Sequence, residues 1–154
     1  MQREQFLSAV YLIIKNEEGK ILFQRRQGTK LWPGFLGLPA GHIDNGENAY
    51  EAAIREAREE LDITFTTNDI VDTFVVNRQN KSLQPYYDIY FELKSYQGKI
   101  KINEPEKCSE LTWCDINNLP NDIIDFERYA LLNNQKGIKF STIYTNNEKS
   151  INKI

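Results

Sequence analysis

The chain has 154 residues, of which 40% are hydrophobic and 27% are charged, so we expect one globular domain without extensive disorder. Its formal net charge of −3 gives no support to binding of nucleic acid or of acidic membranes. The single histidine excludes metal sites that need two or three histidines, and two cysteines are too few for a disulfide scaffold.

The first part of the chain predicts two strands, a loop and a helix. Residues 8–14 are apolar on both alternating faces, which indicates a strand buried on both sides. A turn at 16–19 precedes a second strand over 20–26, which we expect to pair with the first as a hairpin. Residues 27–40 hold three glycines and two prolines without periodicity, which predicts a loop, and a helix is predicted over 48–61.

The second part of the chain predicts further strands followed by one helix. Alternate residues are apolar over 86–93, which is typical of a strand with one buried face. The other predicted elements are strands over 70–77, 99–102 and 111–115 and a helix over 121–132. This order is typical of a mixed sheet with helices packed on it. Residues 145–154 are rich in Asn and Lys, so we expect a frayed tail after a single domain of residues 1–144.

The helix predicted over 48–61 carries carboxylates where they repel one another. On a helical wheel, Glu56, Glu59 and Glu60 share one narrow face in the last turns, where like charges and the helix dipole destabilise the helix. A solvated acidic face is the simplest alternative, but it does not explain this placement. Clustered carboxylates bind Mg²⁺ or Mn²⁺, and Mg²⁺ usually accompanies a phosphate substrate. The apolar stripe that we expect to face the core consists of Tyr50, Ile54, Ala57 and Leu61.

These glutamates lie within a longer motif, which reads Gly41-x5-Glu47-x7-Arg55-Glu56-x2-Glu59-Glu60-x2-Ile63. The motif resembles the Nudix box, the signature of the Nudix (MutT-like) hydrolases. It departs from that signature at Ala57, which is small for an aliphatic position, and at Asp62, where a glycine usually ends the helix. The resemblance extends over residues 8–120 and includes Arg25-Arg26, residues 37–42, Glu104-Pro105-Glu106-Lys107, Trp113 and Leu119-Pro120.

The resemblance implies a Nudix-type α/β/α sandwich around a mixed β-sheet, and hydrolysis of a nucleoside diphosphate linked to another moiety. Carried onto this chain, it makes Glu56, Glu60 and Glu59 the expected ligands of Mg²⁺ or Mn²⁺, with the carbonyl of Gly41 as a further ligand. The metal would activate water, and Glu59 or Glu56 would take its proton. Arg55 would orient the glutamates through charge-assisted hydrogen bonds.

Several other residues are candidates for contacts with the substrate or the metal. Arg25 and Arg26 face opposite sides of their strand, so we expect only one of them, preferably Arg26, to contact phosphate. Glu47 is a third candidate substrate-binding residue, for which pairing with Arg55 is the alternative. The candidates for a fourth metal carboxylate are Glu104, Glu106 and Glu110; Trp32, Phe35 and Tyr90 are candidates for base stacking, with core packing as the default; His42 is expected to have a structural role.

The function expected first is hydrolysis of a nucleoside triphosphate, with oxidised dGTP among the candidates, to the monophosphate and pyrophosphate. The alternatives are hydrolysis of ADP-ribose, a nucleotide sugar or a dinucleoside polyphosphate. A non-catalytic nucleotide sensor would be expected to lack box carboxylates that this chain keeps, and a structural module predicts no divalent-metal binding. The longest apolar stretch, residues 9–14, is far too short to span a membrane. We therefore expect a cytoplasmic monomer or homodimer that binds a small nucleotide and neither a nucleic acid polymer nor a membrane.

Overall fold

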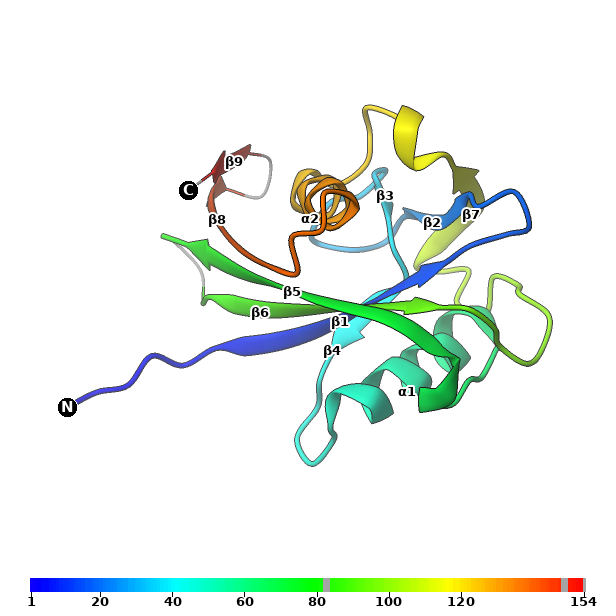
Figure 1. Ribbon diagram of the computed structural model, residues 1–154, viewed down its shortest axis with the longest axis horizontal. Helices are drawn as coiled ribbons and strands as arrows, with labels where there is room; N and C mark the ends of the chain where they lie inside the picture. The colour runs from blue at the N-terminus through cyan, green and yellow to red at the C-terminus, as the bar shows by residue number, and fades with distance from the viewer. Residues whose placement is uncertain (82–83, 148–149, 154) are drawn as a thin grey trace.

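The computed structural model describes residues 1–81, 84–147 and 150–153 (Figure 1). Its strands are β1 (Leu7–Ile14), β2 (Ile21–Arg26), β3 (Leu36–Gly37), β4 (Ala40–His42), β5 (Ile70–Asn80), β6 (Tyr86–Leu93), β7 (Cys108–Cys114), β8 (Phe140–Asn147) and β9 (Ser150–Lys153). Its helices are α1 (Ala49–Leu61) and α2 (Asp125–Gln135), with short 3-10 turns at Thr67–Asp69 and Ile116–Asn118. One sheet has the order β4-β1-β6-β5-β8-β9 and the other β3-β2-β7.

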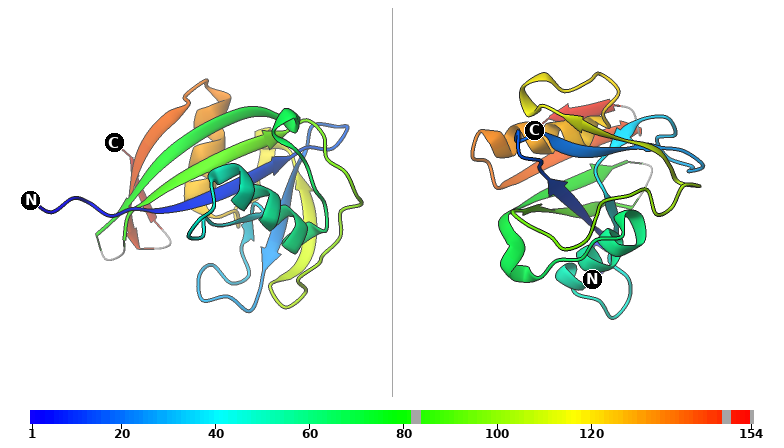
Figure 2. Two further views of the ribbon diagram at one scale, coloured as in Figure 1. Left: turned by 90° about the horizontal axis from the view of Figure 1, so that it is seen from below. Right: turned by 90° about the vertical axis from the view of Figure 1, so that its right-hand side faces the viewer.

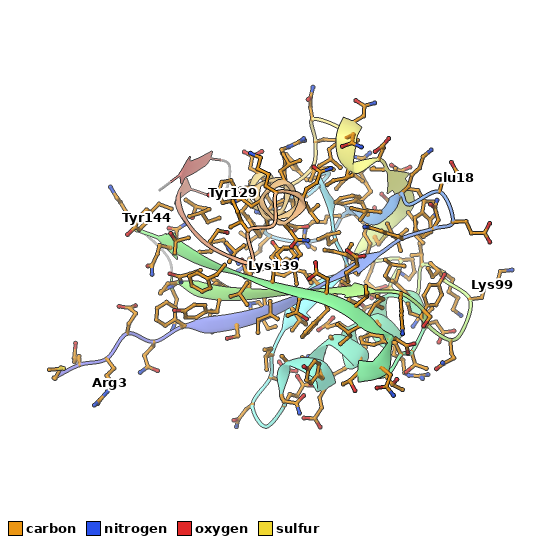
Figure 3. The ribbon with its side chains drawn as sticks, viewed as in Figure 1. Arg3, Glu18, Lys99, Tyr129, Lys139 and Tyr144 are labelled. Carbon is orange, nitrogen blue, oxygen red and sulfur yellow. The ribbon has the colours of Figure 1, made fainter. Side chains whose placement is uncertain are left out.

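The two helices cover opposite faces of the larger sheet, which gives three layers (Figures 1 and 2). In β1, Val10 and Leu12 pack with α1, whereas Tyr11 and Ile13 pack in the cluster that includes α2. The sheet is mixed because β1 is parallel to β6 and β5 is antiparallel to β6. The predictions of a mixed α/β sandwich and of a first strand buried on both sides are therefore confirmed. Side chains fill the space on both sides of the larger sheet, whereas the labelled side chains of Arg3, Glu18 and Lys99 point away from the body of the protein (Figure 3).

The predicted hairpin between the first two strands is wrong. Strand β1 pairs with β4 and β6 in the larger sheet, and β2 pairs with β3 and β7 in the smaller one. A single bridge, Lys15 to Ile21, joins the two segments within the described residues. The turn reverses the chain, but the apolar contacts that fix the pairing come from segments far away in the sequence, which a local pattern does not report.

The segment 99–102 is not a strand, because its backbone bonds to a helix end instead of a sheet. The N–H of Lys101 donates to the carbonyl of Leu61 at 3.1 Å, and the N–H of Asn103 donates to that of Glu60 at 3.0 Å. These bonds satisfy carbonyls that the last turn of α1 leaves free. The segment 27–40, predicted as loop, contains β3 and the first residue of β4.

The segment 145–154, predicted to be frayed, holds the end of β8 and strand β9. Strand β8 runs parallel to β5, and β9 is antiparallel to β8 at the edge of the larger sheet. In the part of the chain that the structure describes, no helix is both long and apolar enough to cross a membrane.

Candidate active site

Helix α1 is fixed at both ends by residues of its own segment. Asn48 caps the first turn, because its Oδ1 accepts from the N–H of Glu51 at 2.8 Å while Glu51 Oε1 accepts from the N–H of Asn48 at 3.0 Å. At the other end, Asp62 adopts the left-handed conformation (φ 58°, ψ 38°), and its N–H bonds to the carbonyls of Ala57 and Arg58. Asp62 therefore ends the helix with the geometry that glycine usually provides.

The face that α1 buries is rotated from the predicted apolar stripe toward the glutamates. Tyr50, predicted to lie in the core, is 45% exposed. The fully buried residues are Ala52, Ala53, Ala57 and Leu61, which pack on β1. Alanines let the helix approach the sheet closely, and this close packing outweighs burial of the larger tyrosine. Glu56 and Glu60 lie between Ala52 and Ala57 on the helical wheel, so both point toward the sheet, while Glu59 is exposed.

Gly41 in β4 makes room for the carboxylate of Glu56. Gly41 pairs with Val10 of the neighbouring strand, which fixes its backbone opposite the helix. A Cβ atom at this position would overlap the carboxyl group of Glu56. The absence of a side chain therefore lets Glu56 lie directly against the backbone of β4, next to the carbonyl that was predicted as a metal ligand.

Arg55 ties the acidic residues of the motif together. Its Nε and Nη2 donate to the two oxygens of Glu47 at 2.7 and 3.0 Å, a bidentate pair. Its Nη1 donates to Glu56 Oε1 at 2.7 Å and to Glu59 Oε2 at 3.3 Å, and Nη2 donates to the carbonyl of His42 at 3.0 Å. The hydrogen bond to Glu47 raises the pKa of Arg55 and lowers that of Glu47. The structure thus places Glu47 against Arg55 and not on the wall of the cavity described below.

The two inward glutamates repel each other in a poorly solvated setting. Burial raises the pKa of Glu60 well above its usual range and the charge of Glu56 raises it further, although the N–H of Ala40 donates to Glu60 Oε2 at 3.1 Å. Burial also raises the pKa of Glu56, against the effect of Arg55, and Glu59 and Glu104 add to the rise. A proton or a cation can relieve this repulsion, and the hard oxygen donors of the two carboxylates fit Mg²⁺ or Mn²⁺.

This arrangement is not yet a closed coordination shell. Among the residues that the structure describes, no three acidic, histidine or cysteine side chains already surround one point. Nη1 of Arg55 lies between Glu56 and Glu59 and holds both carboxylates. Arg55 engages one oxygen of each carboxylate, Oε1 of Glu56 and Oε2 of Glu59, which leaves the second oxygen of each for an ion.

Glu60→Gln should leave the metal-free protein at least as stable as the wild type at neutral pH. Since the folded-state pKa of Glu60 is raised, the folded protein binds this proton more tightly than the unfolded chain, and stability falls as pH rises from about 4.5 through the folded pKa. Glutamine keeps an acceptor for Ala40 and removes the charge. Denaturant unfolding in EDTA should show a gain of a few tenths of a kcal/mol or more at pH 7 and none at pH 4. A loss of about 2 kcal/mol at pH 7 would indicate a structural role instead.

A cavity of about 800 Å³ joins the glutamates to the far side of the larger sheet. Its acidic end contains Gly41, Glu56, Glu60 and Glu104. The aromatic residues on its wall are Tyr11, Trp32, Tyr86 and Phe126, and the basic ones are Arg26, Lys30, Arg55, Arg78 and Lys107. Acidic, basic and aromatic side chains in one cavity match the metal, phosphates and base of a nucleotide complex.

The structure separates the paired candidates of the sequence. Arg26 lines the cavity, whereas Arg25 is held outside it by Glu110, 2.9 Å from its Nε, and by Asp122, 2.5 Å from its Nη1. Of the three acidic candidates around position 106, Glu104 lines the cavity, and Glu106 and Glu110 do not.

The aromatic candidates also divide. Tyr90 is fully buried and stacks between Tyr11 and Phe74, at centroid distances of 4.5 and 4.8 Å, which confirms the default expectation of core packing. Trp32 lies on the cavity wall, and Phe35 packs edge-on against it at 5.0 Å. Tyr90 cannot reach a base, because the centre of β6 is covered on both faces.

Sequence reasoning missed the residues that close the far end of the cavity. The guanidinium carbon of Arg78 lies 4.1 Å from the centroids of the Tyr86 and Phe126 rings, between β5, β6 and α2. Arg78 Nε and Nη2 donate to the fully buried Asp88 at 2.7 and 3.1 Å. An aspartate within the apolar strand 86–93 was the one local signal, because a buried carboxylate requires a partner.

A model of the NUDIX domain matches residues 5–134 of the chain. The chain belongs to the Nudix hydrolase family. This Nudix protein is therefore a hydrolase that acts on phosphorus anhydrides, in a family that generally uses divalent metal ions and acts on small nucleotides. Its fold is also that of a MutT Nudix hydrolase from Burkholderia pseudomallei, with a TM-score of 0.70 and 25% identity over 84% of this chain and 98% of that one.

Two relatives illustrate the range of substrates in the family. A Bacillus subtilis (strain 168) protein, named provisionally as an 8-oxo-dGTP diphosphatase, is 40% identical over 115 residues, which span 75% of this chain and 70% of the relative. An RNA pyrophosphohydrolase of Bartonella henselae is 25% identical over 149 residues, which span 80% of this chain and 84% of the relative. The similarity establishes the family, and the substrate of this Nudix hydrolase depends on its own cavity.

Proposed function

We propose that this Nudix hydrolase is a Mg²⁺-dependent pyrophosphohydrolase that converts a nucleoside triphosphate into the monophosphate and pyrophosphate. The observation that supports this most strongly is the single cavity with an acidic end at Glu56 and Glu60 and an aromatic wall at its far end. A nucleoside triphosphate has the matching polarity, since its phosphates need cations and its base stacks on aromatic rings. The 40% identity with the Bacillus subtilis relative makes 8-oxo-dGTP a candidate substrate.

Each residue of the site has a distinct part in this proposal. Glu56 and Glu60 hold the metal with the carbonyl of Gly41. Glu104 is near enough for its charge to raise the pKa of both glutamates. When bound, Mg²⁺ neutralises phosphate charge and lowers the pKa of water. Arg26, on the cavity wall, binds phosphate oxygens. Glu59 is exposed and takes the proton from the attacking water, with Glu56 as the alternative.

Hydrolysis should disappear in EDTA and return with Mg²⁺ or Mn²⁺. Without a divalent ion, the negative charges of the inward glutamates would repel the negative charges of the triphosphate. The measurement is a chromatographic assay that separates pyrophosphate from orthophosphate, with dGTP, 8-oxo-dGTP, ATP, ADP-ribose, diadenosine tetraphosphate and 5′-triphosphorylated RNA as substrates. We expect the monophosphate and pyrophosphate from a nucleoside triphosphate. Full activity without divalent ions would contradict the metal site, and turnover of ADP-ribose alone would contradict the substrate class.

A further inference from the structure

Glu127 is a buried carboxyl group on the wall of the cavity, on the opposite side of the larger sheet from α1. It lies in the first turn of α2 and is 3% exposed. Its Oε1 accepts a hydrogen bond from the N–H of Leu38 at 2.7 Å, which fixes the orientation of the carboxyl group. The other oxygen, Oε2, has no hydrogen-bond partner among the residues that the structure describes.

The space beside Oε2 is left open by a glycine. A Cβ atom at Gly37 would lie 3.3 Å from Glu127 Oε2 and 3.0 Å from a methyl group of Ile124. A larger residue at position 37 would therefore cover the free oxygen. With glycine there, Oε2 stays uncovered, and Glu127 lines a cavity large enough for a nucleotide.

The surroundings of Glu127 favour the neutral acid. The charged and titratable groups that act on it come from four strands: Tyr11 from β1, Arg26 from β2, Arg78 from β5, and Asp88 and Tyr90 from β6. None of them forms an ion pair with Glu127, and Arg78 is committed to Asp88. Burial raises the pKa of Glu127 to about 8, despite the hydrogen bond from Leu38 and the charge of Arg26. At neutral pH, Oε2 therefore carries a proton that it can donate.

We propose that Glu127 reads the nucleobase, by donating a hydrogen bond from Oε2 to an acceptor atom on the edge of the base. This inference rests on the proposed function, since it assumes that the base occupies the aromatic end of the cavity. Phe126, adjacent in α2, and Trp32 supply apolar walls on which a base can lie. The bond from Leu38 leaves only one carboxyl oxygen free, so the contact selects for an acceptor at a single position of the base.

Two variants separate base recognition from a purely structural role. In Glu127→Gln, the Leu38 N–H keeps the amide oxygen as its acceptor, so the amide N–H₂ takes the place of Oε2 and remains a donor. In Glu127→Leu, the donor is lost. The measured quantity is the ratio of kcat/KM between the best and the worst of dATP, dGTP, dCTP and dTTP. A ratio cancels effects on the metal site that all substrates share, and Asp125→Asn on the same turn of α2, outside the cavity, is the matched control.

We expect Glu127→Gln to keep the wild-type preference and Glu127→Leu to reduce it about tenfold or more, with Asp125→Asn unchanged. The wild-type preference should decline as pH rises through about 8, because the carboxylate that forms can no longer donate, whereas that of Glu127→Gln should not depend on pH. An unchanged preference in folded Glu127→Leu would overturn the proposal. So would loss of the preference in Glu127→Gln.

Binding of the four deoxynucleoside monophosphates, measured by calorimetry, gives the same comparison without hydrolysis. If triphosphates are not hydrolysed but the monophosphates show this preference, the proposed function fails and the role of Glu127 stands. If triphosphates are hydrolysed and the variants discriminate as the wild type does, the proposed function stands and the role of Glu127 fails. Thermal unfolding of Glu127→Leu confirms that its loss of preference is measured on folded protein.

Discussion

Glu56→Gln and Glu60→Gln should each lower turnover at least about 100-fold, because ligation of the metal and neutralisation of phosphate charge contribute several kcal/mol in such sites. Both side chains line the cavity and point toward the sheet. Each substitution keeps the size of the side chain and removes one charge. Steady-state kinetics with Mg²⁺ and a nucleoside triphosphate give the measurement, and a titration with Mn²⁺ should show weaker metal binding in both variants.

Glu51→Gln is the matched control for these two variants, since it removes one charge from the same helix. Glu51 is exposed, and its Oε1 accepts a hydrogen bond from the N–H of Asn48 in the helix cap. The amide oxygen of glutamine can accept the same bond. Its turnover should therefore remain close to that of the wild type. A general electrostatic effect of α1 would lower the turnover of all three variants alike. Equal losses of turnover in Glu51→Gln and Glu56→Gln would contradict the assignment of the catalytic face.

Gly41→Ala should abolish most of the activity, with a loss of about 100-fold or more, although it adds only a methyl group. The new Cβ would occupy the position of the Glu56 carboxylate and displace it from the backbone of β4. Misplacement of a catalytic group by about 1 Å can cost about 100-fold in rate. Steady-state kinetics and Mn²⁺ affinity should both report the displacement.

Gly19→Ala is the control for Gly41→Ala, and we expect it to lower stability without lowering turnover. Gly19 has open space around it and a φ of +78°, in the turn between β1 and β2. Alanine there should cost about 1 kcal/mol of stability through backbone strain and leave turnover unchanged. If Gly41→Ala behaved in the same way, losing stability but keeping its rate and metal affinity, the close contact between Gly41 and Glu56 would have no catalytic meaning.

The glutamates of the acidic end could be predicted from the sequence because Glu56 and Glu60 are close together along one helix. Repulsion between neighbouring turns of a helix is a local property, and so is the pairing of Arg55 with Glu47, eight residues earlier. The depth of the helix in the fold was not predictable in this way. Tyr50 outranks alanine as an apolar residue, but the close approach of α1 to β1 selected the alanine face.

The far end of the cavity escaped prediction because its residues meet only in the folded chain. Arg78, Tyr86, Phe126 and Glu127 come from β5, β6 and α2, and no fixed spacing links them. For Tyr90 the default expectation of core packing is confirmed, but nothing local in the sequence separates a core ring in a strand from one on a binding surface.

The bonds between residues 101–103 and the end of α1 link two walls of the cavity mechanically. The Nδ2 of Asn103 donates to the carbonyls of Arg58 and Glu59 at 3.2 and 3.1 Å. The backbone N–H of the same residue donates to the carbonyl of Glu60. The next residue, Glu104, lines the cavity. Four hydrogen bonds therefore fasten the loop to the last helical turn, and they fix the position of Glu104 relative to Glu60 through the backbone rather than through a side-chain contact. A lengthened loop at this point would uncouple the two walls while leaving every residue of the Nudix motif in place.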